Sequence, residues 1–196
     1  AALCSAGLAD GLLAMTSSHF CAAERQFRTP LSYGAVRTPT AQWTATAAGC
    51  CLLHPAGQGV GIAAATFGRV EDYQIKDINN MGGAMAPAAA ATLLRYLRDT
   101  GQEPKEFDAI YTGDLGHLGS RLFREILTAE GLVMKNHIDC GSILYDAARQ
   151  NVKSGGSGPG CCAAVLCGHI LPRLGRGRYR RVLFSATGAL MSQTTF

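Results

Sequence analysis

Residues 107–131 read FDAIYTGDLGHLGSRLFREILTAEG, a short apolar run that leads directly into a helical pattern. The helical part carries four large apolar residues on one face, Leu122, Phe123, Ile126 and Leu127. Its charged residues fall elsewhere, which is typical of an amphipathic helix. The apolar run before it is bounded by turn formers and predicts a strand. A strand followed at once by such a helix is the repeating unit of a layered α/β protein.

The same alternation continues on both sides of this unit. Upstream, Pro87 lies near the start of an alanine-rich run and Gly101 follows its end, which predicts a helix over about residues 86–99. Asn80 and its polar neighbours are expected to bond the preceding loop and cap this helix. Downstream, residues 161–175 predict a helix.

Strands are predicted at both ends of the chain. LLAMTSSH, residues 12–19, reads as a buried strand, and RRVLFSATG, residues 180–188, reads as a strand. Residues 43–54 and 59–70 flank the turn-forming PAGQG and predict a β-hairpin. Strands that alternate with helices of ten or more residues predict the α/β class, with sheet buried between helices.

Composition excludes several classes of protein. The 196 residues are 47% hydrophobic, enough for a core, and the net charge of +4 is scattered, so we expect no nucleic acid partner. The eight cysteines lack paired zinc-site spacing, so no metal site is expected and most are read as small core residues. No apolar run approaches the roughly 20 residues of a membrane span. Because the sequence opens without methionine in a helical pattern, we expect it to be incomplete.

The glycine-rich stretch SGGSGPGCC, residues 154–162, precedes the helix predicted from residue 161. Its backbone N–H groups could cradle an anion at the helix start, or its glycines could merely allow close packing; spacing alone leaves both open. Cys161 and Cys162 fall in the first turn, where the helix dipole could lower a thiol pKa. No histidine is evidently placed as their base and their neighbours suggest burial, so we do not expect a nucleophile here.

Several longer blocks resemble one known family. They include TSSHF, PTAQWT, IKDINNMGGAMAPAAA, TGDLG, GGSG and ATGALMS, and they run along nearly the whole chain. They resemble the stage V sporulation protein AD (SpoVAD) family. That resemblance implies a thiolase-like fold, a layered αβαβα sandwich of two related halves, here incomplete at both ends. Residues 1–42 would be the end of the N-terminal half and residues 43–196 most of the C-terminal half.

The resemblance also implies a function. The family binds dipicolinic acid and serves the SpoVA apparatus, which loads calcium dipicolinate into the developing spore. The expected ligand is therefore dipicolinic acid or its calcium chelate, with no cofactor. The expected location is the forespore or spore, peripheral at the inner membrane through other SpoVA proteins. A homodimer is expected from analogy with the fold.

Enzymes related to this family are condensing enzymes that pair a cysteine nucleophile with histidine partners. One such histidine is replaced here, because TGDLGHLG puts Gly113 and Asp114 at the matching position. A carboxylate there would repel a developing oxyanion, so we expect a non-catalytic protein. The alternative is a thiolase or ketoacyl synthase-type acyltransferase acting on an acyl thioester, which would need an upstream cysteine and a histidine such as His117.

A flat dicarboxylate needs apolar walls and a few donors or cations, and arginine suits a carboxylate well. The candidate ligand-binding residues are His19, Arg25, Arg28, Asp114, His117, Ser157 and Gly158. The arginines could instead form surface ion pairs, and His19 could be a buried histidine. Pro159 stands where the family pattern has a cysteine and removes one N–H, so a working cradle must use the amides of Gly158, Gly160 or Cys161.

Overall fold

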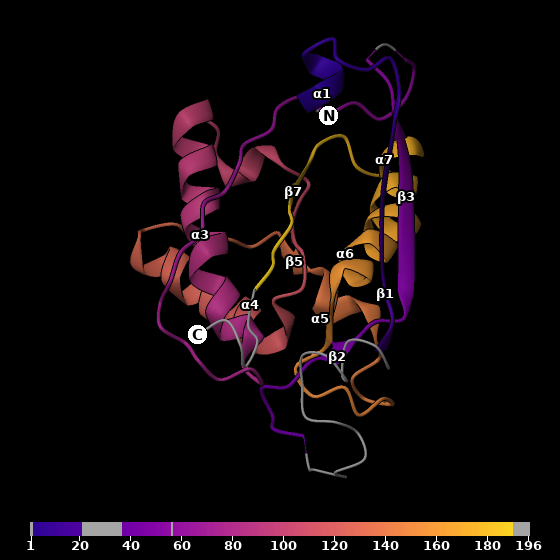
Figure 1. The fold of residues 1–196 in the computed structure, drawn as a ribbon. Coiled ribbons are helices and arrows are strands. Elements are labelled where there is room, and N and C mark those ends of the chain that lie inside the picture. Colours follow the sequence, from indigo (N-terminus) through magenta and orange to yellow (C-terminus); the bar gives the residue numbers. More distant parts are fainter. Residues whose placement is uncertain (1, 21–36, 56, 190–196) are drawn as a thin grey trace.

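The computed structural model describes residues 2–20, 37–55 and 57–189 (Figure 1). Its helices are α1 (Ala2–Ser5), α3 (Met81–Thr100), the 3₁₀ turn η2 (Pro104–Glu106), α4 (Gly116–Ala129), α5 (Cys140–Leu144), α6 (Pro159–Val165), the π turn η3 (Leu166–Ile170) and α7 (Leu171–Gly175). Its strands are β1 (Leu12–Ser18), β2 (Trp43–Thr44), β3 (Ala47–Leu53), β4 (Ala109–Thr112), β5 (His137–Asp139), β6 (Gly156–Ser157) and β7 (Val182–Ser185). Arg25 and Arg28 lie outside the described residues.

The central sheet has the order β5-β4-β7, and all of its strands are parallel. Its middle strand, β4, is buried throughout. Side chains alternate along a strand, so Ile110 joins the core on one face while Tyr111 joins the core on the other. The sheet is therefore covered on both faces, as the expected α/β class requires.

Helices α3 and α4 cover one face of this sheet (Figure 1). Helix α3 begins at Met81, earlier than predicted, because the Asn80 side chain caps it by accepting the N–H of Gly83. Gly101 ends it in the left-handed conformation, as predicted. The two helices approach so closely that a Cβ on Gly119 would lie 2.8 Å from the Cα of Gly82.

Helices α5, α6 and α7 lie on the other face of the sheet. The helix predicted over residues 161–175 is present, but its middle is the π turn, so its course is α6, η3 and α7. Val165 and Ile170 from this run pack with Tyr111 of β4 in a second apolar core.

The predicted hairpin between residues 43–54 and 59–70 is wrong. Strand β3 pairs along its length with β1 instead, antiparallel, with Leu12 opposite Leu53 and Ser18 opposite Ala47. Residues 59–70 form no strand. The pairing with β1 extends over all seven residues of β3, which outweighs a local turn, and three glycines weaken the strand propensity of residues 59–70. Strand β1 forms where it was predicted, but most of its side chains are exposed and not buried.

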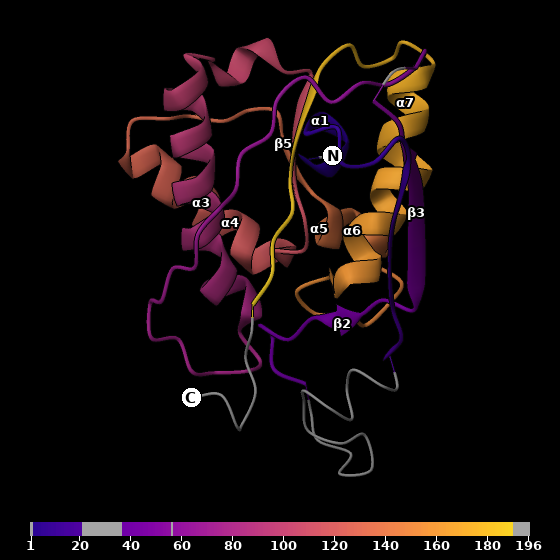
Figure 2. The same ribbon diagram turned by 45° about the horizontal axis from the view of Figure 1, so that its top comes forward.

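Strands β1 and β3 pack on the outer side of α6. Close contact at Gly49 allows this, since a Cβ there would lie 2.8 Å from the Cβ of Ala163. Figure 2 shows the resulting order: α3 with α4, the central sheet, the helices that end in α7, then β3. The α/β class is confirmed, while the five-layer sandwich and the division at residues 42 and 43 stay predictions.

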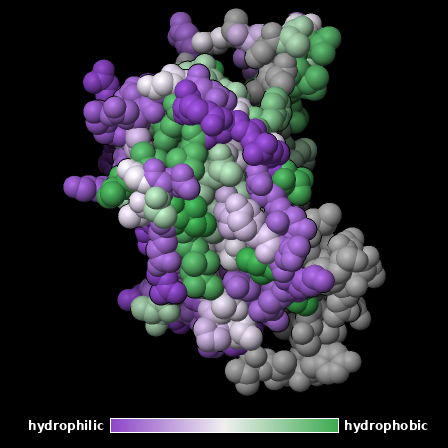
Figure 3. Space-filling model, turned by 90° about the vertical axis from the view of Figure 1, so that its left-hand side faces the viewer, coloured by the Kyte–Doolittle hydropathy of each residue, from purple (hydrophilic) through white to green (hydrophobic). Residues whose placement is uncertain are grey.

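The surface on the α3 side carries a band of apolar side chains between hydrophilic ones (Figure 3). Residues 59–76 have no regular structure, and some of their large apolar side chains are exposed, notably Phe67 and Val70. Within the described residues, no helix combines the length and the apolar character that crossing a membrane requires.

Candidate ligand-binding site

Asp114 follows β4 and lies where three segments meet. Its Oδ2 accepts a hydrogen bond from the Gly158 N–H at 2.8 Å, and its Oδ1 accepts one from the Thr187 hydroxyl at 2.8 Å. The Thr187 oxygen in turn accepts the Asp114 N–H at 2.9 Å. Asp114 is 5% exposed. The structure thus brings Asp114 together with Gly158, and the carboxylate ties the segments to one another.

The amides that an anion cradle in the glycine-rich stretch would need are already bonded within the chain. The Gly158 N–H is taken by Asp114, the Gly160 N–H donates to Ser18 Oγ at 3.0 Å, and the Cys161 N–H donates to the Gly158 carbonyl at 2.9 Å. All three donors named in the prediction therefore act inside the chain. The stretch does hold a carboxylate, but that carboxylate is the side chain of Asp114. Spacing could not reveal this, because the acceptors come from distant parts of the sequence.

Ser157 lies in the short strand β6, which pairs in parallel with β2. Trp43 is opposite Gly156 and Thr44 is opposite Ser157. Gln42 fastens the same place, because its Nε2 donates to the carbonyls of Asp114 at 2.7 Å and Gly156 at 2.9 Å. Ser157 is 1% exposed, so it belongs to a packed junction and not to an open wall.

Asp139 is a second buried carboxylate near this junction. Its Oδ1 accepts from the Thr112 hydroxyl at 2.7 Å and the Leu115 N–H at 2.9 Å. Its Oδ2 accepts from the N–H groups of Gly116 at 2.9 Å and Ser142 at 3.0 Å. Burial raises the pKa of this carboxyl, and the hydrogen bonds act against that rise. Asp139 therefore fixes the turn between β4 and α4 and caps α5, a role the sequence analysis missed.

The cysteines close to the junction are poor nucleophiles. Cys140 and Cys161 are fully buried. Burial raises the pKa of both thiols, and the carboxylates of Asp114 and Asp139 raise the pKa of each further. Burial likewise raises the pKa of Cys162. Thiols in this state are protonated at neutral pH and lack the reactive thiolate.

Alkylation should report this directly. In the folded protein at pH 8, we expect iodoacetamide to label the exposed Cys50 and to leave Cys140 and Cys161 unmodified over the same time. Peptide mass spectrometry after unfolding and a second, isotopically distinct label would give the modified fraction of each cysteine. Labelling of Cys161 as fast as Cys50 would contradict the buried, protonated thiol.

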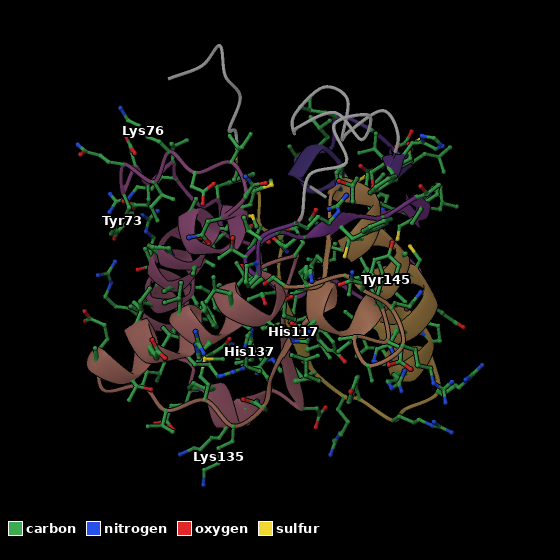
Figure 4. All side chains as sticks on the ribbon, turned by 90° about the horizontal axis from the view of Figure 1, so that it is seen from below. Tyr73, Lys76, His117, Lys135, His137 and Tyr145 are labelled. Atoms are coloured by element: carbon green, nitrogen blue, oxygen red, sulfur yellow. The ribbon has the colours of Figure 1, made fainter. Side chains whose placement is uncertain are left out.

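The other predicted site residues lie apart from Asp114 or outside the described residues. His19 is exposed just after β1. His117 is exposed in the first turn of α4 and lies beside His137, away from Tyr145 (Figure 4). Arg25 and Arg28 cannot be placed, since they are not among the described residues. Across the described ranges, no group of three or more His, Cys, Asp or Glu side chains could hold a metal ion.

A pocket of about 660 Å³ lies beside the start of the glycine-rich stretch. Its walls carry two cationic and two aromatic side chains, Arg37, Lys153, Trp43 and Tyr145. The pocket is partly open, and the buried Val152 is among the residues that line it. Lys153 has a φ of 55°, a left-handed conformation that is unusual for a side chain of this size. The arrangement suits a flat, negatively charged molecule.

The Arg37 side chain is held in place by aromatic rings. Its guanidinium lies 4.3 Å from the ring centre of Trp43 and 5.4 Å from that of Phe20. Phe20 and Trp43 themselves stack, with centroids 4.2 Å apart and planes 11° from parallel. Arg37 also donates to the Gln42 carbonyl at 3.3 Å. A cation fixed over a ring in this way is preorganised toward a ligand in the pocket.

Sequence analysis did not name the residues of this pocket. Trp43 offered one signal, because it is the only tryptophan of the 196 residues and lies in a block shared with the family. Lys153 offered another, as a cation directly before the glycine-rich stretch. Tyr145 and Arg37 offered none, because only the fold brings residues 37–43 against residues 145–153.

Comparison with known proteins shows which family the chain is similar to. The family model described as stage V sporulation protein AD matches residues 1–196. Stage V sporulation protein AD of Bacillus subtilis (strain 168) is 42% identical over 194 residues, which cover 98% of this chain. The chain spans 57% of the length of that curated relative.

Proposed function

Because this chain belongs to the stage V sporulation protein AD family, we propose that the protein is a non-catalytic binder of dipicolinic acid, or its calcium chelate, during sporulation. In this role it supports uptake of calcium dipicolinate into the developing spore. Its partners are other SpoVA proteins, which hold it peripherally at the inner membrane of the forespore, and a homodimer is part of the proposal.

One observation carries the proposal: the pocket bounded by Arg37, Lys153, Trp43 and Tyr145. Dipicolinic acid is a flat aromatic ring with a carboxylate on each side of the ring nitrogen. Two cations match two carboxylates, and aromatic side chains match the faces or edges of the ring. Asp114 takes no direct part, because both of its carboxylate oxygens already accept hydrogen bonds within the chain.

The non-catalytic part of the proposal has its own support. Cys161 is buried with a raised pKa, and the position expected for a catalytic histidine carries Asp114 in a structural role. The acyltransferase alternative would need a binding mode for an acyl thioester. No contact of the described residues favours it over the anion-binding pocket.

Calorimetric titration of the full-length protein tests the proposal. We expect saturable binding of dipicolinic acid, measured with and without calcium, and no binding of an acyl-CoA. The Lys153→Gln variant should bind at least about tenfold more weakly, because a hydrogen bond to a charged group contributes roughly 1.5–3 kcal/mol. Quenching of Trp43 fluorescence during the titration would report the occupied pocket.

Lys135→Gln provides the matched control, since Lys135 is also an exposed lysine but does not line the pocket. Its affinity should equal that of the unmodified protein. Equal affinities for both variants would exclude the pocket as the dipicolinate site. Binding of the acyl-CoA in place of dipicolinate would instead favour the acyltransferase.

A further inference from the structure

A second hollow of about 230 Å³ lies between α4, the end of β5 and the start of α5. His117, Ser120 and Arg124 line it from α4, where their spacing puts them along one face of the helix. His137 and Ser142 line it from the opposite side. Figure 4 shows His117 and His137 beside each other, apart from Tyr145 of the larger pocket.

The hollow has one acidic residue in its wall, Asp139, and that carboxylate is already satisfied. It is 3% exposed and accepts hydrogen bonds from the Thr112 hydroxyl and from three backbone N–H groups. These donors offset its charge, so it has little capacity left to pair with a cation in the hollow.

The hydrogen bonds fix the tautomer of His137. Thr112 has a single hydroxyl proton, which it donates to Asp139 at 2.7 Å, so its oxygen must accept from His137 Nε2 at 2.9 Å. The proton of the neutral ring is therefore on Nε2, and the Nδ1 lone pair faces Arg124 Nη1 at 3.5 Å. Burial and the nearby Arg124 lower the pKa of His137 to about 4. His137 is thus a neutral group that orients the arginine.

Arg124 forms no ion pair with the described residues, unlike Arg121 on the same helix, whose partner is Glu125 at 3.9 Å. Its contact with His137 uses one N–H and leaves the rest of the guanidinium available. Ser120 adds a buried hydroxyl that has no hydrogen-bond partner in the described part of the chain. The walls of the hollow therefore carry the Arg124 guanidinium, the exposed His117 imidazole and the Ser120 hydroxyl.

We infer that this hollow binds a small oxyanion, a carboxylate or a phosphate, with Arg124 as its main ligand and His117 as a second donor. The guanidinium can hold two oxygens of such a group at once. His117 and Arg124 are seven residues apart, about 10 Å along the helix, so the imidazole reaches the ligand from the other end of the hollow. The site is independent of the proposed function, since it shares no residue with the larger pocket.

The test is a titration of the full-length protein with sodium phosphate and, separately, sodium acetate at constant ionic strength. Long-range ¹H–¹⁵N NMR spectra of the histidine rings are the readout. We expect saturable shifts of the His117 and His137 signals with at least one of the two anions. Saturation with phosphate alone or acetate alone identifies the class of ligand.

Variants on one helix provide the controls. Arg124→Gln should weaken anion binding at least about tenfold. Arg121→Gln removes another exposed arginine that does not line the hollow, so it should leave the affinity within about twofold. His117→Gln should also weaken anion binding, measured from the NMR signals of the His137 ring. This second variant keeps the test valid even if Arg124→Gln does not fold. Shifts that stay linear in both anions, or equal losses in Arg124→Gln and Arg121→Gln, would overturn the site.

Discussion

Replacing Asp139 with asparagine should destabilise the fold by about 3 kcal/mol, because buried hydrogen bonds to a charged group contribute roughly 1.5–3 kcal/mol each. Each carboxylate oxygen of Asp139 accepts a pair of donors within 3.0 Å, and Oδ2 also accepts the Ser142 hydroxyl at 3.4 Å. An asparagine must turn its NH₂ group toward one of these pairs, so at least two donors would face another donor. Urea unfolding of the full-length protein, monitored by circular dichroism, gives the change in the free energy of unfolding.

Asp108→Asn is the matched control. Asp108 also accepts two backbone N–H groups, from Arg180 at 2.6 Å and Arg181 at 2.9 Å, but it is exposed. Water can replace the lost acceptor there, so we expect a much smaller loss of stability than in Asp139→Asn. If the free energy of unfolding falls equally in both variants, burial does not explain how much Asp139 contributes to stability.

Gly82→Ala should also lower stability strongly, by about 2–3 kcal/mol, as is typical of overpacking between close elements. A Cβ at this position would collide with the Leu115 carbonyl oxygen and would lie 3.1 Å from the Gly119 N. These are backbone atoms of α4 and its preceding turn, so they cannot turn aside as a side chain could. Thermal and urea unfolding would measure the loss.

Gly168→Ala separates this contact from the general effect of a glycine in a helix. Gly168 lies in the π turn, and a Cβ there has no neighbour within 4 Å. Alanine favours helical backbone, so this variant should be neutral or more stable by up to about 1 kcal/mol. A similar loss in both variants would show that the approach of α3 to α4 tolerates a methyl group at residue 82.

The elements with strong local signals were predictable from the sequence. The strand β4, the amphipathic α4 and the helix ended by Gly101 all follow from periodicity and terminal residues. The partner of β3 was not predictable, because β1 pairs with it across a long stretch of sequence while a turn-rich PAGQG suggested a local hairpin. Local propensity describes a segment, whereas pairing depends on which segments the fold brings together.

The candidate site was harder to predict for the same reason. Asp114, Ser157 and Gly158 were predicted to bind a ligand, whereas the Asp114 carboxylate forms hydrogen bonds within the chain, to Gly158 and Thr187. Asp139 is one charged residue in a short polar segment, and nothing in its spacing indicates burial. The pocket around Trp43 depends on two segments more than a hundred residues apart. Only the folded chain shows that these segments meet.

The two-residue ladder between β2 and β6 connects the two sides of the larger pocket. Trp43 and Lys153 stand on its two sides. Further bonds join the same two segments: the Trp43 N–H to the Gly155 carbonyl at 2.8 Å, the Ala45 N–H to the Ser157 carbonyl at 2.9 Å, the Ser154 N–H to the Ala41 carbonyl at 2.9 Å, and the Gln42 side chain to the Gly156 carbonyl at 2.9 Å. A ligand that contacts both sides adds to these bonds, so an occupied pocket and a closed ladder stabilise each other.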